Sequence, residues 1–555
     1  MRELSVYLVA GLVFTVFIAC GGGGGGAEPE DAGPQPDAAS EVVADATVAP
    51  DADATLPDAA LDVSADTAPR TTPGGLPLEL PFVVTRADKG EAVTDEEITA
   101  FTRRITGLWK QVDYFTWVYE TSHGVDASTG FPDYLIWWHD VDAIKEGDTV
   151  TFMNQAQYGG SHNNAEPTNL VLVQAIGAYL LNGDPAAGEI VEQFAKSNVA
   201  LQKGFVFDGD DPLDHILARN IITFNHDFVL PSGKKKAVDY TDWYFPYEGW
   251  NADRFNYPNN PTYGDVWVTN MRSKDDVPYH FRAAAWLPYV IELAPDDDVR
   301  DAAIEMLDYT QRFAKDIVES DWNIRTKDAE GKAFIEEAQD LLSLAWWVDL
   351  FPDAECDARL AAALMGYGDP HGVECGKGWG SMYEEAAGDI NYFNYQIIDH
   401  YHLIALHLAL TLGHEDVAEE LLVGLGERLD YYLDPASKLA GQESDRWGRD
   451  ISLVALKGAS LGLPLTWEEV RLIHQFHDGA VTRYSEFPNW DLWDESVPDG
   501  VYSFRDGFHP KTEGDAVRPE EIAFLLEYCW SPFKNPESRP VVDCDIVMDP
   551  GLWGE

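Results

Sequence analysis

The chain has 555 residues, 45% of them apolar, so it is long enough for a tail and a large folded domain with a substantial core. Its 96 acidic and 38 basic residues give a formal net charge of −58, which excludes nucleic acid and other polyanions as favoured partners. Neutral or cationic ligands, or bound Ca²⁺, suit this charge better, and adaptation for solubility explains it without any specific partner.

Residues 1–20 are typical of an export signal. The apolar run from Val6 to Ile18 is too short to span a bilayer permanently, but it suits a signal-peptide core. Phe17-Ile18-Ala19-Cys20 resembles the lipobox of bacterial lipoproteins. The resemblance implies that Cys20 is lipidated and holds the chain to a membrane of the cell envelope, at the outer membrane or cell surface. An ordinary signal peptide or an anchor helix is the alternative.

Residues 21–75 form a tether rich in Gly, Ala, Asp and Pro. The segment contains no aromatic residue, so it cannot bury enough apolar surface to offset the entropy of ordering. We therefore predict a disordered tether and a folded domain over residues 76–555.

The folded domain is predicted to begin with a helix and a small β insertion. Thr94-Asp95-Glu96-Glu97 is an N-terminal helix signal, and apolar residues at helical spacing continue to about Glu120. Residues 133–154 alternate and are rich in β-formers, which predicts a hairpin or small sheet.

Helical hairpins follow, each with an inner helix that is apolar all round, a short turn and a one-sided outer helix. The predicted inner and outer pairs are 168–181 with 190–201, 275–293 with 299–317, 334–350 with 356–365, 391–412 with 417–432, and 451–463 with 467–476. A last helix is predicted at 522–530, and the repeat of about 55 to 60 residues indicates a helical array.

Inner helices that are buried on every side favour a closed ring over an open solenoid. The pattern over about 94–530 resembles the (α/α) toroid class of many glycoside hydrolases and polysaccharide lyases. The resemblance is one of architecture only. We therefore predict an all-α fold, an (α/α) toroid of five to six hairpins with a small β insertion near the N-terminus.

Once Cys20 is lipidated, four cysteines remain, and an even number outside the cytoplasm indicates disulfides. Four cysteines allow three pairings, and we favour the sequence-local one, Cys356–Cys375 and Cys529–Cys544. Zinc is the weaker interpretation, because no CxxC spacing is present.

The connections between hairpins are long and are expected at one end of the ring, where long ordered loops are usually functional. They hold many of the 18 Trp, and aromatic rings stack well on sugar faces, although packing of loops onto the barrel explains any single ring as well. The substrate-binding candidates are His162, Asn163, Asn164, Trp243, Tyr244, Trp250, Trp379, Trp447 and Trp493.

The catalytic candidates are carboxylates in these connections, because glycoside hydrolysis needs one as acid and one as base or nucleophile. Asp242 lies in the most aromatic run of the chain, where desolvation would raise its pKa and suit a general acid. Its candidate partners are Glu384, Glu385, Glu443 and Asp445. Surface ion pairing is the alternative for each.

Metal-binding patterns are weak. The acids of 208–214 have calcium-like density without EF-hand spacing, and His474 and His477 share a helix face with no HExxH motif. We expect no required cofactor, with Ca²⁺ as the metal to test.

These patterns favour a surface-tethered lipoprotein that acts on a neutral glycan, most simply by hydrolysis. A polysaccharide lyase and a non-catalytic glycan- or ligand-binding lipoprotein are the alternatives, and a toroid enzyme acting on lipid or peptide is a third.

Overall fold

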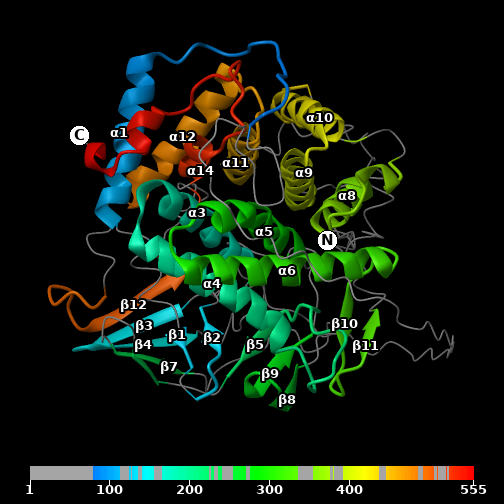
Figure 1. Ribbon diagram of the computed structural model, residues 1–555. Coiled ribbons are helices and arrows are strands. Elements are labelled where there is room, and N and C mark those ends of the chain that lie inside the picture. The colour runs from blue at the N-terminus through cyan, green and yellow to red at the C-terminus, as the bar shows by residue number, and fades with distance from the viewer. Residues whose placement is uncertain are drawn as a thin grey trace, which may run out of the picture. The chain divides into compact units, whose positions relative to one another are not determined.

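The computed structural model describes the folded part of the chain with interruptions, and these residues belong to a compact unit spanning Arg70–Glu555 (Figure 1). The described ranges lie within 79–554. The gaps fall at 113–114, 116–123, 127, 135–140, 155–164, 224–226, 230–234, 240–253, 271–275, 336–353, 376–378, 380–391, 437–444, 485–491, 506–508, 511–520 and 522–523. The described part is mostly helical, as predicted. None of its helices is both long and apolar enough to cross a bilayer.

Four of the predicted hairpins are confirmed. Their helices are α3 (Ala165–Asn182) with α4 (Pro185–Lys203), α5 (Asp276–Leu293) with α6 (Asp297–Glu319), α9 (Tyr392–Leu412) with α10 (Glu415–Leu433), and α11 (Asp445–Ser460) with α12 (Trp467–Tyr484). The turns are built as the sequence indicates. Asp184 caps α4 by accepting hydrogen bonds from the Ala186 and Ala187 amides, and Gly413 ends α9 at a φ of 75°.

The inner and outer members of a hairpin differ in burial as predicted. From Asp399 to Thr411, each side chain of α9 is buried, whereas α10 alternates buried leucines with exposed acids. The same contrast separates α5 from α6. The all-round apolar helices therefore lie inside, and the one-sided helices cover them.

The inner helices form a closed series of contacts. Helix α3 contacts α5, α5 contacts α9, α9 contacts α11, and α11 contacts α14 (Phe524–Trp530), which returns to α3. The outer helices α4, α6 and α10 each pack on the inner helix that precedes them, and α8 (Ala354–Met365) packs on α9. Helix α1 (Asp95–Val112) packs beside α12 and begins with the predicted cap, in which Thr94 and Glu97 exchange hydrogen bonds.

One predicted helix does not begin at the residue that the sequence indicates. Residues 334–350 were expected to form an inner helix, but Phe334 and Ile335 belong to β11 (Ala333–Ile335), which pairs antiparallel with β10 (Arg325–Lys327). The two strands form a local hairpin across the turn at 328–332, where Gly331 has a φ of 77°, so a turn and strand pairing replace the predicted first turn of the helix. Residues 336–353 lie outside the described residues. The outer helix predicted at 356–365 is confirmed as α8.

The predicted β insertion is confirmed, but its sheet includes strands from outside the predicted range 133–154. The hairpin β3 (Val141–Glu146) and β4 (Thr149–Asn154) lies at the centre of a sheet ordered β13-β12-β3-β4-β7-β6. Its other strands come from later connections: β6 (Asp227–Val229), β7 (Lys235–Asp239), β12 (Gly500–Arg505) and β13 (His509–Pro510). The remaining strands are β5 (Asn220–Ile222), β8 (Arg254–Asn260) and β9 (Gly264–Thr269) in one sheet, and β1 (Gly124–Val125) with β2 (Pro132–Asp133). In Figure 1 the strands lie together below α4 and α6, in the lower part of the view.

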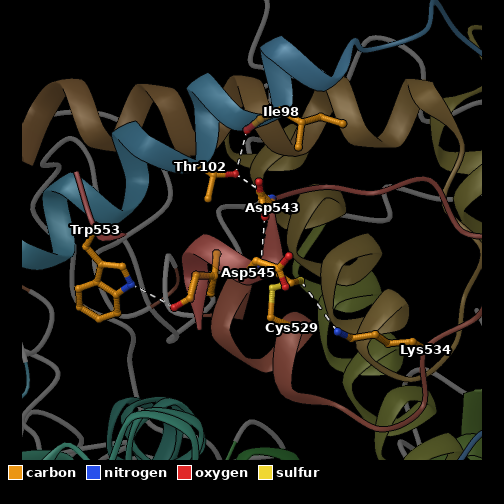
Figure 2. Close-up of a disulfide and its surroundings, with 9 residues drawn as sticks. Ile98, Thr102, Cys529, Lys534, Asp543, Asp545 and Trp553 are labelled. Atoms are coloured by element: carbon orange, nitrogen blue, oxygen red, sulfur yellow. Dashed lines mark hydrogen bonds between the residues drawn. A yellow bond between two sulfur atoms is a disulfide. The ribbon is translucent and has the colours of Figure 1, made fainter. Parts of the chain in front are cut away.

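Both predicted disulfides are confirmed, Cys356–Cys375 and Cys529–Cys544, each with a Cα–Cα separation of 5.3 Å. Figure 2 shows how the second one joins α14 to α15 (Cys544–Val547) beside α1. Thr102 of α1 accepts a hydrogen bond of 2.9 Å from the Asp543 amide, and the Trp553 indole donates to the Val547 carbonyl at 3.0 Å. The C-terminal segment includes the short helix η3 (Pro550–Leu552). The disulfide holds this segment to α14, and the Thr102 hydrogen bond holds it to α1.

Removing the second disulfide tests its contribution. The bond closes a separation of 15 residues, so the double change Cys529→Ala and Cys544→Ala is expected to lower the free energy of unfolding by about 3 kcal/mol. Urea unfolding of both proteins without reductant measures the difference. Unchanged stability, or free thiols in a non-reducing peptide map of the native chain, would contradict this assignment.

Candidate functional site

Most of the predicted site residues lie outside the described residues. These are Asp242, Glu384, Glu385, Glu443, His162, Asn163, Asn164, Trp243, Tyr244 and Trp250. Asp445 and Trp447 are within the described backbone, but on the first turn of α11 and not in a loop as expected. Helix α11 begins at Asp445, before the predicted start at Ile451.

The two remaining aromatic candidates have packing contacts. Trp379 and Trp493 are partly buried and pack against the core. The Trp379 ring lies edge-on to His371, with 5.1 Å between ring centroids. Their positions fit the packing alternative as well as the predicted role in substrate binding, which stays a prediction.

Inside the series of inner helices, aromatic side chains form a compact layer. Trp286 and Tyr289 of α5 lie against His407 of α9, with 4.1 Å between the Trp286 and His407 rings. Trp530 of α14 packs on both α5 rings, at centroid distances of 4.7 and 5.2 Å, and Phe533 borders the group. This aromatic layer involves the second halves of α5 and α9, far from the long connections that precede these helices.

A polar layer lies next to it, toward the first halves of the same helices. Arg282 of α5 donates two hydrogen bonds to Glu527 of α14, at 2.8 and 2.9 Å. Lys457 of α11 lies 4.4 Å from the centroid of the Phe524 ring, which the Arg282 guanidinium approaches at 5.4 Å. His400 of α9 contributes an imidazole 4.7 Å from the Tyr279 ring. None of Arg282, Glu527, Lys457 and His400 is more than 4% exposed, so four helices meet in one buried ionic cluster.

Burial controls protonation in this polar layer. It lowers the pKa of Lys457 to about 7, assisted by repulsion from Arg282 and opposed by attraction to Glu521 and Glu527. Burial also lowers the pKa of His400 and His407 well below the usual value, and the nearby Arg282 adds to both effects. Near neutral pH the layer therefore holds neutral imidazoles beside an amine that can gain or lose a proton.

Several polar atoms of these two layers have no hydrogen-bond partner within the described part of the chain. They are His400 Nδ1, His407 Nε2, Trp286 Nε1 and Tyr289 Oη. A buried polar atom without a partner costs free energy, so each of these four atoms needs a further polar contact to offset its burial.

A second buried network of charged residues joins α8, α9 and α10. Arg428 of α10 bridges Asp357 of α8, at 2.7 Å, and Asp399 of α9, at 3.4 Å, while Tyr432 donates to Asp399 and His402 lies against Asp357. Burial raises the pKa of Asp399 to about 7 although Arg428 opposes the rise. The network joins inner to outer helices, so its geometry indicates a structural role.

The metal candidates have other partners. Lys327 binds Asp211 at 2.7 Å and Arg312 binds Asp214 at 2.5 Å, within the segment of calcium-like acid density. His474 hydrogen-bonds the Val541 carbonyl and His477 the Ile473 carbonyl. Among the described residues, no group of His, Cys, Asp and Glu side chains is arranged to hold a metal ion.

Sequence reasoning missed the polar layer. Its signal is a charged or imidazole side chain inside a helix that is otherwise apolar all round, such as Arg282 in α5 or His400 in α9. Only the fold brings these residues together with Lys457 and Glu527. In comparisons with known proteins, no family model, curated protein or solved structure matches this chain.

Proposed function

We propose that the helical hairpins form an (α/α) toroid with α3, α5, α9, α11 and α14 in its inner ring. The support is the closed series of contacts among these helices and the burial contrast between inner and outer members. The long connections before α5, α9 and α11 then share one end of the ring, since every inner helix runs away from that end.

The function that this arrangement supports best is the hydrolysis of a neutral glycan. The observation that carries it is the buried ionic cluster of Arg282, Glu527, Lys457 and His400 inside the ring. It lies on the side of the aromatic layer that is nearer the N-terminal ends of α5 and α9. Its charges of both signs suit an uncharged polar ligand, which we propose is a sugar held between this cluster and carboxylates on the connections.

A polysaccharide lyase is the second candidate, and Lys457 is the observation that favours it. A buried amine with a pKa of about 7 is a competent proton acceptor at neutral pH. Beside the Arg282 cation it could remove the proton next to a carboxylate of an acidic sugar. A lyase leaves an unsaturated sugar that absorbs ultraviolet light, whereas a hydrolase leaves only a new reducing end.

The localisation that we propose is the cell envelope, with a lipid on Cys20 and residues 21–75 as a tether. Cys20 and the tether lie outside the described residues. Cys20→Ser is expected to move the protein from the membrane fraction to the soluble fraction, or to leave the signal uncleaved, because the acyl chains anchor it. Fractionation and labelling with a fatty-acid probe measure this. Equal labelling of wild type and Cys20→Ser would contradict lipidation.

A further inference from the structure

A small cavity of about 250 Å³ opens between the C-terminal ends of α6 and α8. One wall comes from the end of α6 and the residues after it, namely Lys315, Glu319 and Trp322, and the other from the segment Gly366–Val373 after α8. This volume lies just below the usual range for drug-sized ligands, so it suits a ligand of the size of a single sugar ring.

The backbone at Trp322 is unusual. Asp321 and Trp322 have φ values of 56° and 65°, the left-handed region that side chains with a Cβ rarely adopt. The Trp322 amide donates to the Ile317 carbonyl at 2.9 Å, and the Arg359 guanidinium lies 5.5 Å from the indole. Both residues follow directly after the end of α6, where a left-handed residue and this hydrogen bond commonly end a helix, so the cap fixes the position of the Trp322 backbone.

The opposite wall is also fixed in place. Disulfide Cys356–Cys375 ties the end of this segment back to α8, and the Asp369 carboxylate accepts a hydrogen bond of 3.0 Å from the His371 amide. Gly366 lies so close to α6 that a Cβ there would come within 3.1 Å of Lys315 Cγ. Both walls are therefore pre-organised, which lowers the entropy cost of binding.

The chemistry of the lining matches a neutral sugar. Trp322 offers an aromatic face, the exposed Glu319 and Asp369 carboxylates accept hydrogen bonds from hydroxyl groups, and Lys315 donates. The Glu319 and Asp369 carboxylates disfavour an anionic ligand, and Lys315 opposes a cationic one.

We propose that this cavity binds one ring of a neutral polysaccharide at a distance from the cleaved bond, which makes the substrate a polymer. The inference rests on the proposed glycan-hydrolysing function. Its wall from Gly366 to Val373 begins the connection from α8 to α9, and the same connection carries the predicted catalytic Glu384 and Glu385.

The test uses the full-length protein with maltohexaose, cellohexaose, mannohexaose and xylohexaose and the matching polysaccharides as probes. On the polymer that is cleaved, Trp322→Ala is expected to raise KM by about ten-fold and leave kcat unchanged. The lost stacking contact binds the substrate and the transition state equally, so its loss weakens binding without slowing the chemical step. KM for the matching aryl monoglycoside, which is too short to reach the cavity, should not change. Gly372→Trp, at a lining position with open space around its Cβ, should block the cavity and give the same result.

Trp467→Ala is the matched control, since Arg539 lies 5.4 Å from the Trp467 ring and this pair lines no part of the cavity. The subsite is wrong if Trp322→Ala and Gly372→Trp behave like Trp467→Ala, or if either lowers kcat with KM unchanged. If the wild-type protein cleaves none of the probes, the hydrolase proposal itself is wrong. That result comes from the wild type alone, so it is distinct from a failure of the subsite proposal.

Discussion

Asp242→Asn and Glu384→Gln are each expected to reduce turnover by about 10²–10⁴-fold, the usual contribution of a general acid or base. Both changes keep the size of the side chain and remove its ionisable proton. If these residues are the catalytic pair, kcat falls while the protein stays folded, because neither variant creates a cavity. Initial rates on the polysaccharide that the wild type cleaves measure the effect.

The control for this prediction is Glu420→Gln, the same chemical change at an exposed position on α10, which should retain the wild-type rate. Glu443→Gln separates the candidate partners, since only the true partner of Asp242 should reduce the rate as strongly. Near-normal rates in Asp242→Asn, Glu384→Gln and Glu443→Gln together would show that the carboxylate assignment is wrong.

Acidification is expected to destabilise the protein strongly. Burial lowers the pKa of His280 and of His477 from 6.5 to about 4, and it also lowers the pKa of His400 and of His407 well below 6.5. Between pH 6.5 and pH 4 the unfolded chain therefore binds more protons at these histidines than the folded chain does. The contribution of the neutral histidines to the free energy of unfolding is present above pH 6.5 and is lost as the pH falls toward 4. His280 and His477 alone account for about 3 kcal/mol each at pH 4.

One group opposes this trend. Asp399 has a raised pKa of about 7, so its contribution is present below about pH 4 and lost as the pH rises through 7, amounting to about 4 kcal/mol. The histidines outweigh it, because the four named above shift in the same direction and so do His215, His402, His414 and His474. Urea unfolding at pH 7.5 and pH 4 should show a net loss of stability on acidification.

His280→Gln isolates one histidine from the rest. His280 lies between Asn198 and Thr310, each 3.1 Å from one ring nitrogen, and an amide can still bond to both neighbours. The variant should lose about 3 kcal/mol less than wild type between pH 7.5 and pH 4. An identical pH dependence in the two proteins, or a wild type that gains stability on acidification, would contradict this account of the buried histidines.

The helical hairpins could be predicted from sequence because their signals are local. Apolar residues on every side of α9, the turn at Gly413 and one apolar face on α10 each depend only on neighbours along the chain. The strands were largely missed for the opposite reason. The pairing of β12 with β3, and the parallel pairing of β4 with β7, join segments far apart in sequence.

The polar layer could not be predicted because it depends on distance in space. Arg282 and Glu527 each lie in a helix of mostly apolar residues, and nothing in either segment identifies the partner. The predicted catalytic carboxylates are the reverse case. The sequence predicts them in aromatic-rich connections, and apart from Asp445 they lie outside the described residues, so kinetics of the variants is the way to assign them.

The central claim is that the chain hydrolyses a neutral glycan, and one measurement tests it most directly. The purified full-length protein is incubated with neutral and acidic polysaccharides, with and without Ca²⁺, while new reducing ends and ultraviolet absorbance are followed together. The account predicts reducing ends from a neutral polymer, no increase in absorbance, and no dependence on Ca²⁺. Unsaturated products from an acidic polymer, or tight glycan binding without any turnover, would contradict it.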